Sequence, residues 1–111
     1  VKEAWGEMIS EPVHAIVSTW ALHDLGSPKN IKTVYDSSYR ALEHNGILVN
    51  GDFIKPSGAV QEFEGGRFYV EKHLELLGSA GFSNASCLSI FEEEIENPTA
   101  AQNYACIWAE K

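Results

Sequence analysis

The sequence has few residues of the kinds that build disulfide frameworks or metal sites. Its 111 residues include two cysteines, Cys87 and Cys106, which do not form a C-x-x-C motif. The four histidines are scattered along the chain, without the ligand spacing that a zinc site requires. We therefore expect no metal and no disulfide, and reduced cysteines favour a cytoplasmic protein.

Long apolar runs and an excess of basic residues are also missing. No stretch approaches the length of about 20 apolar residues that a membrane-spanning helix needs, and residues 1–5 do not open a signal peptide. Eight basic residues against 16 acidic residues give a net charge of -8. Because carboxylates repel phosphate backbones and anionic lipids, this composition disfavours nucleic acid and membranes as partners.

Residues 13–53 show the order strand, polar turn, amphipathic helix and strand. The apolar run 13–17 is followed by a cluster of hydrogen-bonding side chains at 18–24. Ser27 is placed to cap a helix and Pro28 to begin it, and apolar residues then recur at helical spacing up to Leu42. Asn45-Gly46 is expected to end this helix, and the strand from Ile47 ends near Asp52. Both polar clusters thus lie at carboxyl ends of strands, where ligands bind in open α/β sheets.

The rest of the chain predicts one more helix and two more strands. A loop rich in Gly, Pro and Ser covers 55–66, with Val60 and Phe63 as expected anchors, and is the obvious lid or substrate loop. A helix from Phe68 is expected to end at Gly81 and to carry His73 as a packed or surface residue. Strands follow at 85–91 and 103–109, separated by an acidic, exposed loop at 92–102.

Residues 1–9 are expected to form a short helix. With 44% hydrophobic residues and no repeat or linker, residues 1–111 are expected to form a single α/β unit.

Three segments together resemble the second half of a class I S-adenosylmethionine-dependent methyltransferase. They are 21–25 (ALHDL), 39–49 (YRALEHNGILV) and 76–82 (LLGSAGF), in the family's order and spacing. Asn45 departs from the family's usual glycine, but asparagine tolerates the left-handed conformation. The resemblance covers about residues 13 to 109. It implies a partial Rossmann-like sheet, with strands equivalent to the family's fourth to seventh, the last strand antiparallel and helices packed on the sheet.

The family's cofactor signature is absent from this sequence. No glycine-rich turn follows a first strand, and no acid lies about 20 residues beyond one to bind ribose. The resemblance therefore implies part of an enzyme that transfers methyl groups to a small-molecule acceptor and is inactive without the missing N-terminal half. The strand at 13–18 would become an open edge, and Ile16, Leu48, Ile90 and Ile107 or their neighbours would lose their cover. We expect self-association, as a dimer, or a complementary N-terminal half.

By position, the resemblance implies roles for residues after the first two strands. Ser18, Thr19 and Trp20 would lie near the S-adenosylmethionine cofactor. His23 and Asp24 would be catalytic, because an imidazole can accept a proton near neutral pH and an acid, Asp24 or Asp52, could orient it. The acceptor would contact Trp20, His23, Asp52 and Phe53.

Each of these roles has a structural alternative. His23 could cap the following loop, with catalysis by proximity alone. Trp20 either forms an aromatic wall of the site or packs under the next helix. Asp52 either binds substrate or caps the loop that begins at Phe53.

Two other functions remain open from the sequence. The chain could be a non-catalytic α/β interaction or dimerisation module. It could also belong to another class of α/β enzyme, although it lacks the G-x-S-x-G turn of hydrolases and the glycine turn of nucleotide oxidoreductases.

Overall fold

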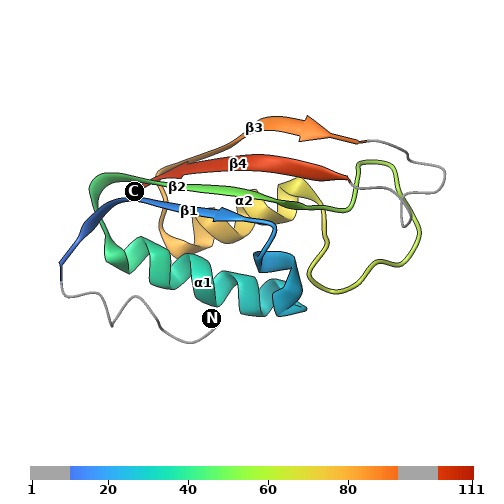
Figure 1. The fold of residues 1–111 in the computed structure, drawn as a ribbon, viewed down its shortest axis with the longest axis horizontal. Coiled ribbons are helices and arrows are strands. Elements are labelled where there is room, and N and C mark those ends of the chain that lie inside the picture. Colours follow the sequence, from blue (N-terminus) through green and yellow to red (C-terminus); the bar gives the residue numbers. More distant parts are fainter. Residues whose placement is uncertain (1–10, 93–102) are drawn as a thin grey trace.

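A computed structural model describes residues 11–92 and 103–111 of the chain. Their elements are, in order, β1 (Val13–Thr19), the 3-10 helix η2 (Leu22–Leu25), α1 (Pro28–Ala41), β2 (Leu42–Phe53), α2 (Val70–Ala80), β3 (Asn84–Phe91) and β4 (Tyr104–Glu110). Within these residues the strands form one sheet in the order β1-β2-β4-β3 (Figure 1). Strand β1 runs parallel to β2, and β4 runs antiparallel to both of its neighbours. The mixed α/β sheet with an antiparallel last strand is confirmed, whereas residues 1–9 and 93–102 lie outside the described part.

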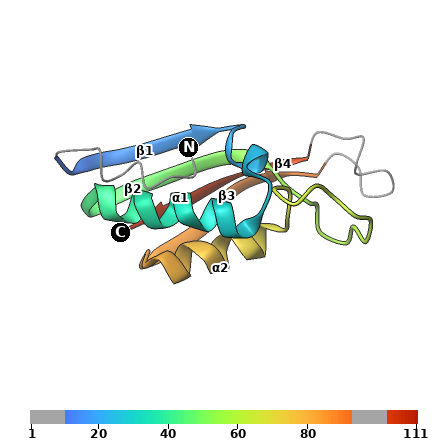
Figure 2. The ribbon, with the colours of Figure 1, turned by 90° about the horizontal axis from the view of Figure 1, so that it is seen from below.

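Both long helices lie on the same face of the sheet. Helix α1 packs beneath β1 and β2, and α2 beneath β4 and β3 (Figures 1 and 2). The core fills the space between the helices and the sheet, and its largest members include Ile31, Tyr35, Leu42, Leu48, Ile54, Leu77 and Ile107. Among the described helices, none has the length and apolar character needed to cross a bilayer.

The ends of the helices follow from local chemistry. The Ser27 side chain accepts a hydrogen bond from the Asn30 amide at 3.1 Å, and Pro28 occupies the first helical position. At the end of α2, Gly81 takes a left-handed conformation with φ of 118°, and its amide bonds back into the last turn. Both boundaries agree with the sequence prediction.

The predicted end of α1 was wrong. The helix ends at Ala41, and Leu42 already begins β2 with its side chain buried. Val13 pairs with Leu42 and Ala15 with Ile47, so residues 43–46 form a bulge in β2. Asn45 does adopt the expected left-handed conformation, with φ of 66°, but it does so inside this bulge. His44 therefore lies in the bulge and not at a helix end.

The opposite face of the sheet carries exposed apolar side chains. Of the four residues expected to lose their cover, Leu48 and Ile107 are buried beneath the helices and Ile16 is half-buried, whereas Ile90 is 49% exposed. Apolar residues next to them are exposed as well, as the expectation allowed, because successive side chains of a strand point to opposite faces. Val17 is 68% exposed, and Leu88, the bulged residue of β3, is 60% exposed.

Three buried polar side chains form a chain between α1, α2 and β2. The Tyr35 hydroxyl lies 2.7 Å from Nδ1 of His73 and accepts a hydrogen bond from the Asn50 amide nitrogen at 3.2 Å. Phe68 stacks on the His73 ring at 4.3 Å between centroids. Burial lowers the pKa of His73 to about 4, and burial also raises the pKa of Tyr35 above its usual range. His73 is therefore a packed, neutral histidine.

Candidate functional site

The candidate site lies at the carboxyl ends of β1 and β2, where the first turn after β1 meets the end of β2. Helix η2 carries His23 and Asp24, and Asp52 is the penultimate residue of β2. Strands β1 and β2 are parallel neighbours, so their carboxyl ends meet at one edge of the sheet. The topology thus brings together His23 and Asp52, which are 29 residues apart in sequence.

Asp52 holds both the ring and the backbone of His23. Its Oδ1 lies 2.7 Å from Nδ1 of the His23 ring, and its Oδ2 accepts the His23 backbone N–H at 2.8 Å. Oδ1 also accepts the Phe53 N–H at 2.8 Å. The His23 ring packs edge-on against Phe53, with 4.9 Å between centroids. Asp52 therefore caps the segment at Phe53, as one alternative had it, and also orients the imidazole of His23.

The electrostatics of this pair come from burial. The Asp52 side chain is inaccessible to solvent, and this burial raises the pKa of its carboxyl above the ordinary value. Hydrogen bonds from His23 and from the Phe53 amide act in the opposite direction and favour the carboxylate. A buried carboxylate on Nδ1 selects the tautomer in which Nδ1 carries the proton, and Nε2 is then the nitrogen that can accept one.

Asp24 contacts the other nitrogen of the ring. Its Oδ1 lies 3.2 Å from Nε2 of His23, but its side chain is 78% exposed. Solvent screens an exposed ion pair, so Asp24 contributes little to fixing the ring. The sequence offered Asp24 and Asp52 as orienting groups. Both contact His23, but only Asp52 does so from a buried position.

Trp20 stands out from the surface beside this pair. Its backbone has φ of 52°, a conformation that bulky residues rarely adopt, and its N–H donates to the Gly51 carbonyl at 2.7 Å. Its ring is 62% exposed and stacks on Phe53 with 6.5 Å between centroids. The interpretation that Trp20 packs beneath the next helix was therefore wrong. The ring forms a wall on the same side as His23.

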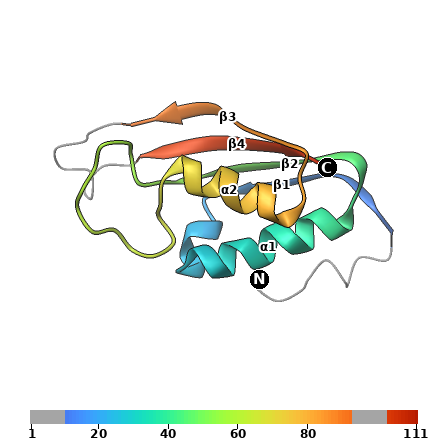
Figure 3. The ribbon, with the colours of Figure 1, turned by 180° about the vertical axis from the view of Figure 1, so that it is seen from behind.

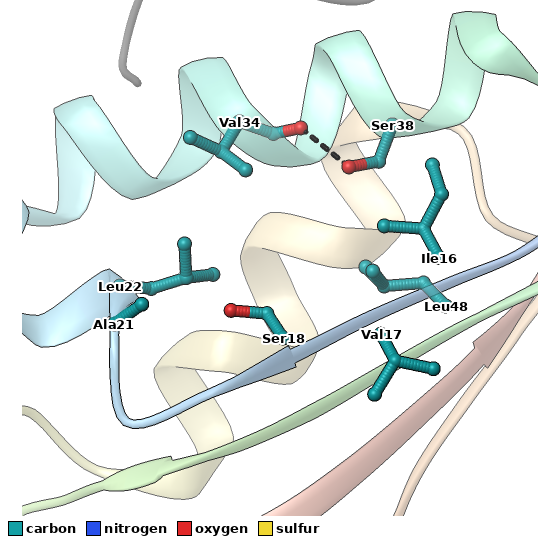
Figure 4. A pocket seen from close by; sticks show the side chains of 8 residues that line it. All are labelled: Ile16, Val17, Ser18, Ala21, Leu22, Val34, Ser38 and Leu48. Carbon is teal, nitrogen blue, oxygen red and sulfur yellow. Dashed lines mark hydrogen bonds between the residues drawn. The ribbon is translucent and has the colours of Figure 1, made fainter.

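Ser18 lines an apolar pocket beside β1, an outer strand among those the structure describes. The pocket has a volume of about 300 Å³ and lies between β1 and α1. Figure 4 shows the Ser18 hydroxyl on the α1 side of the strand, together with Ile16 and Leu48, whereas Val17 points to the other face. Thr19 is exposed and is not part of the pocket lining. Of the three residues proposed for the cofactor, only Ser18 thus lines this pocket.

These residues fit one part of S-adenosylmethionine. Apolar walls and the Ser18 hydroxyl suit the carbon chain of the methionine part, and Trp20 offers an aromatic surface nearby. The pocket lining contains no carboxylate for the ribose hydroxyls and no glycine-rich turn for close backbone contact. This lining therefore does not make a complete cofactor site by itself.

The loop at 55–66 and the residues after it contribute groups that the sequence did not single out. The Arg67 guanidinium lies 5.5 Å from the Phe53 ring centroid and 5.3 Å from that of Phe63. Phe63 is half-buried as expected, but Val60 is 88% exposed and anchors nothing. The adjacent Gly65-Gly66 pair was the only sequence signal for a close contact here.

Metal-ligating side chains do not gather in groups of three or more within residues 11–92 and 103–111. Cys87 in β3 and Cys106 in β4 are free thiols.

Comparison with known proteins gives structural similarity only. No protein-family model matches the sequence, and no curated protein sequence matches it. Among solved structures, PigF in complex with S-adenosylhomocysteine aligns with a TM-score of 0.70 and 22% identity over 98% of this chain. A Nostoc punctiforme protein assigned as an O-methyltransferase aligns with a TM-score of 0.66 and 14% identity over 93% of this chain. A Bordetella parapertussis protein described as exported aligns with a TM-score of 0.69 and 14% identity over 98% of it.

The chain spans only part of each of these proteins. It covers 33% of PigF, 33% of the Nostoc protein and 42% of the Bordetella protein. Similarity at these identities concerns the fold. The chain has a methyltransferase-like fold.

Proposed function

We propose that this chain forms the acceptor side and the methionine side of an S-adenosylmethionine-dependent methyltransferase that acts on a small molecule. The observation that carries the proposal is the buried Asp52 carboxylate, which fixes His23 at the strand ends of a methyltransferase-like fold. The remainder of the cofactor site would come from polypeptide outside these residues, so the chain alone would be inactive.

The chemistry needs alignment and the removal of one proton. When bound, the cofactor would supply an electrophilic methyl group on a sulfonium, and after its carbon–sulfur bond breaks it would leave as S-adenosylhomocysteine, a neutral thioether. Nε2 of His23 would accept the proton from the acceptor's O–H or N–H as the new bond to the methyl carbon forms. Asp52, on Nδ1, would stabilise the resulting imidazolium, as the third member of a catalytic triad does.

The acceptor would lie against the aromatic wall beside His23. Trp20 and Phe53 supply stacked rings, and the Arg67 guanidinium lies over the Phe53 ring. The strained backbone of Trp20 supports a functional role, since such strain gathers at binding sites. A net charge of -8 favours a small molecule over nucleic acid as the acceptor.

Binding of S-adenosylhomocysteine to the isotope-labelled chain tests this proposal. We expect weak binding, with amide chemical shift changes centred on 18–20 and on His23. Adenosine, which lacks the methionine part, is the control ligand and should perturb these amides less. A folded chain that shows no shift changes at millimolar S-adenosylhomocysteine, or changes only elsewhere, would contradict the proposed location.

The exposed sheet face favours a second function, association with other polypeptide. Val17, Leu88 and Phe91 are each close to half exposed or more, and β1 is an unpaired edge among the described strands. A complementary N-terminal half or a second copy of the chain would cover this surface. Light scattering distinguishes a dimer from a monomer, and a monomer at high concentration would argue against self-association.

A further inference from the structure

The backbone of Gly65 and Gly66 lies against the backbone of the segment that carries His23. A methyl group added at Gly66 would sit 1.7 Å from the His23 carbonyl oxygen, and one at Gly65 would sit 2.1 Å from the Gly26 carbonyl oxygen. Both distances lie far below van der Waals contact, and both obstructing atoms belong to the backbone. No residue other than glycine fits at either position without moving η2 or the loop.

We propose that Gly65 and Gly66 are positioning residues that hold η2 in place and so keep the His23 imidazole on Asp52. The catalytic consequence rests on the proposed function of His23. The effect on the position of the His23 ring does not rest on that function, because it concerns only where the ring lies.

The loop that presents the two glycines is tied at several points. The Lys55 amide donates to the Phe68 carbonyl at 3.0 Å and closes the loop at its base. The Tyr69 hydroxyl donates to the Ala59 carbonyl at 2.6 Å, across the loop. A turn closed by the Arg67 amide and the Glu64 carbonyl, at 3.0 Å, carries the glycine pair. Figure 3 shows this loop leaving β2 and returning to α2 beside η2. The loop is therefore constrained, and its backbone contact can hold η2 in position.

The His23 contacts are sensitive to a backbone shift. Asp52 binds both the backbone N–H and ring Nδ1 of His23, at 2.8 and 2.7 Å, so the ring position depends on the backbone position. An alanine at residue 66 would need its neighbour to retreat by more than about 1 Å to relieve the contact at 1.7 Å. A backbone shift of that size would carry the His23–Asp52 distances outside the narrow range in which a hydrogen bond forms.

Gly66→Ala and Gly65→Ala test the proposal, and Gly78→Ala is the matched control. Gly78 lies in α2, where an added methyl group meets no atom within 4 Å. The readout is the ratio of the two neutral His23 tautomers, measured by nitrogen-15 NMR of the imidazole. We expect Gly66→Ala to lower the proportion of the Nδ1–H form relative to the Nε2–H form by about tenfold, as for the loss of a hydrogen bond to a charged acceptor. Gly78→Ala should leave the ratio unchanged.

A purely structural role would lower the melting temperature and leave the tautomer ratio of the folded protein as in the wild type. That result for both loop variants would overturn the proposal. If the variants do not fold, the wild-type chain still provides a test through nuclear Overhauser contacts between the α protons of Gly66 and His23. The absence of such contacts would show that the two backbones do not meet. None of these outcomes depends on methyl transfer.

Discussion

Replacing His23 with glutamine is expected to lower the rate of methyl transfer by about 10²- to 10⁴-fold, the usual contribution of a positioned general base. The physical reason is the loss of Nε2 as a proton acceptor next to the proposed acceptor site. Cofactor affinity should stay unchanged, because the role proposed for His23 is on the acceptor side. The measurement is single-turnover transfer from labelled S-adenosylmethionine, in the polypeptide that contains this chain and its cofactor-binding part.

His44→Gln is the matched control for this experiment. His44 is an exposed histidine that lies in the β2 bulge, at the other end of the strand from Asp52. Its replacement should leave transfer unaffected. A His23→Gln enzyme that keeps the wild-type rate would show that proximity alone drives the reaction, and that the Asp52 contact is structural.

The second large effect concerns stability, which should fall in acid because of His73. The pKa of His73 is about 4 in the folded chain and 6.5 in the reference state, so the unfolded chain binds more protons between these values. The stabilisation from neutral His73 is complete above pH 6.5 and is lost as the pH falls toward 4. We expect a loss of about 2 kcal/mol at pH 5 and about 3 kcal/mol below pH 4. Protonation would also place a hydrogen on Nδ1, so the Tyr35 O–H could no longer donate its hydrogen bond to that nitrogen.

Urea unfolding of the wild type and of His73→Gln at pH 7.5 and pH 5 measures this effect. Asp52 contributes in the opposite direction, because burial raises its pKa, but both proteins carry Asp52 and its effect cancels in the comparison. The variant should lose less stability than the wild type between the two pH values, and His44→Gln should behave as the wild type does. Equal losses in the wild type and His73→Gln would show that His73 does not resist protonation in the fold.

The sequence predicted most of the fold because its signals are local. Ser27, Pro28 and Gly81 mark helix ends through backbone chemistry that needs no tertiary contact. The end of α1 was missed because Leu42 continues the apolar spacing of the helix, yet burial at the junction places it in β2. The alternation of side chains along each strand determines which apolar residues lie beneath the helices, so Leu48 is buried and Val17 is exposed.

The candidate site was predictable in part for a similar reason. Parallel neighbouring strands bring their carboxyl ends together, so the order of the elements alone predicts that His23 lies near Asp52. The choice between Asp24 and Asp52 as the orienting acid depends on burial, which spacing along the chain does not reveal. The positions of Arg67 and of the Gly65-Gly66 contact depend on how the loop after β2 folds back on η2, and no periodic pattern encodes that path.

The tautomer of His23 in the wild-type chain tests the central claim most directly. If His23 is the general base, Asp52 must accept the proton of Nδ1, and Nε2 must carry no proton of its own before it takes one from the acceptor. Nitrogen-15 NMR of the neutral imidazole should therefore show the Nδ1–H form, and Asp52→Asn should weaken that preference. A His23 ring that carries its proton on Nε2 in the wild type would contradict the account, because the nitrogen facing the acceptor could not then act as the base.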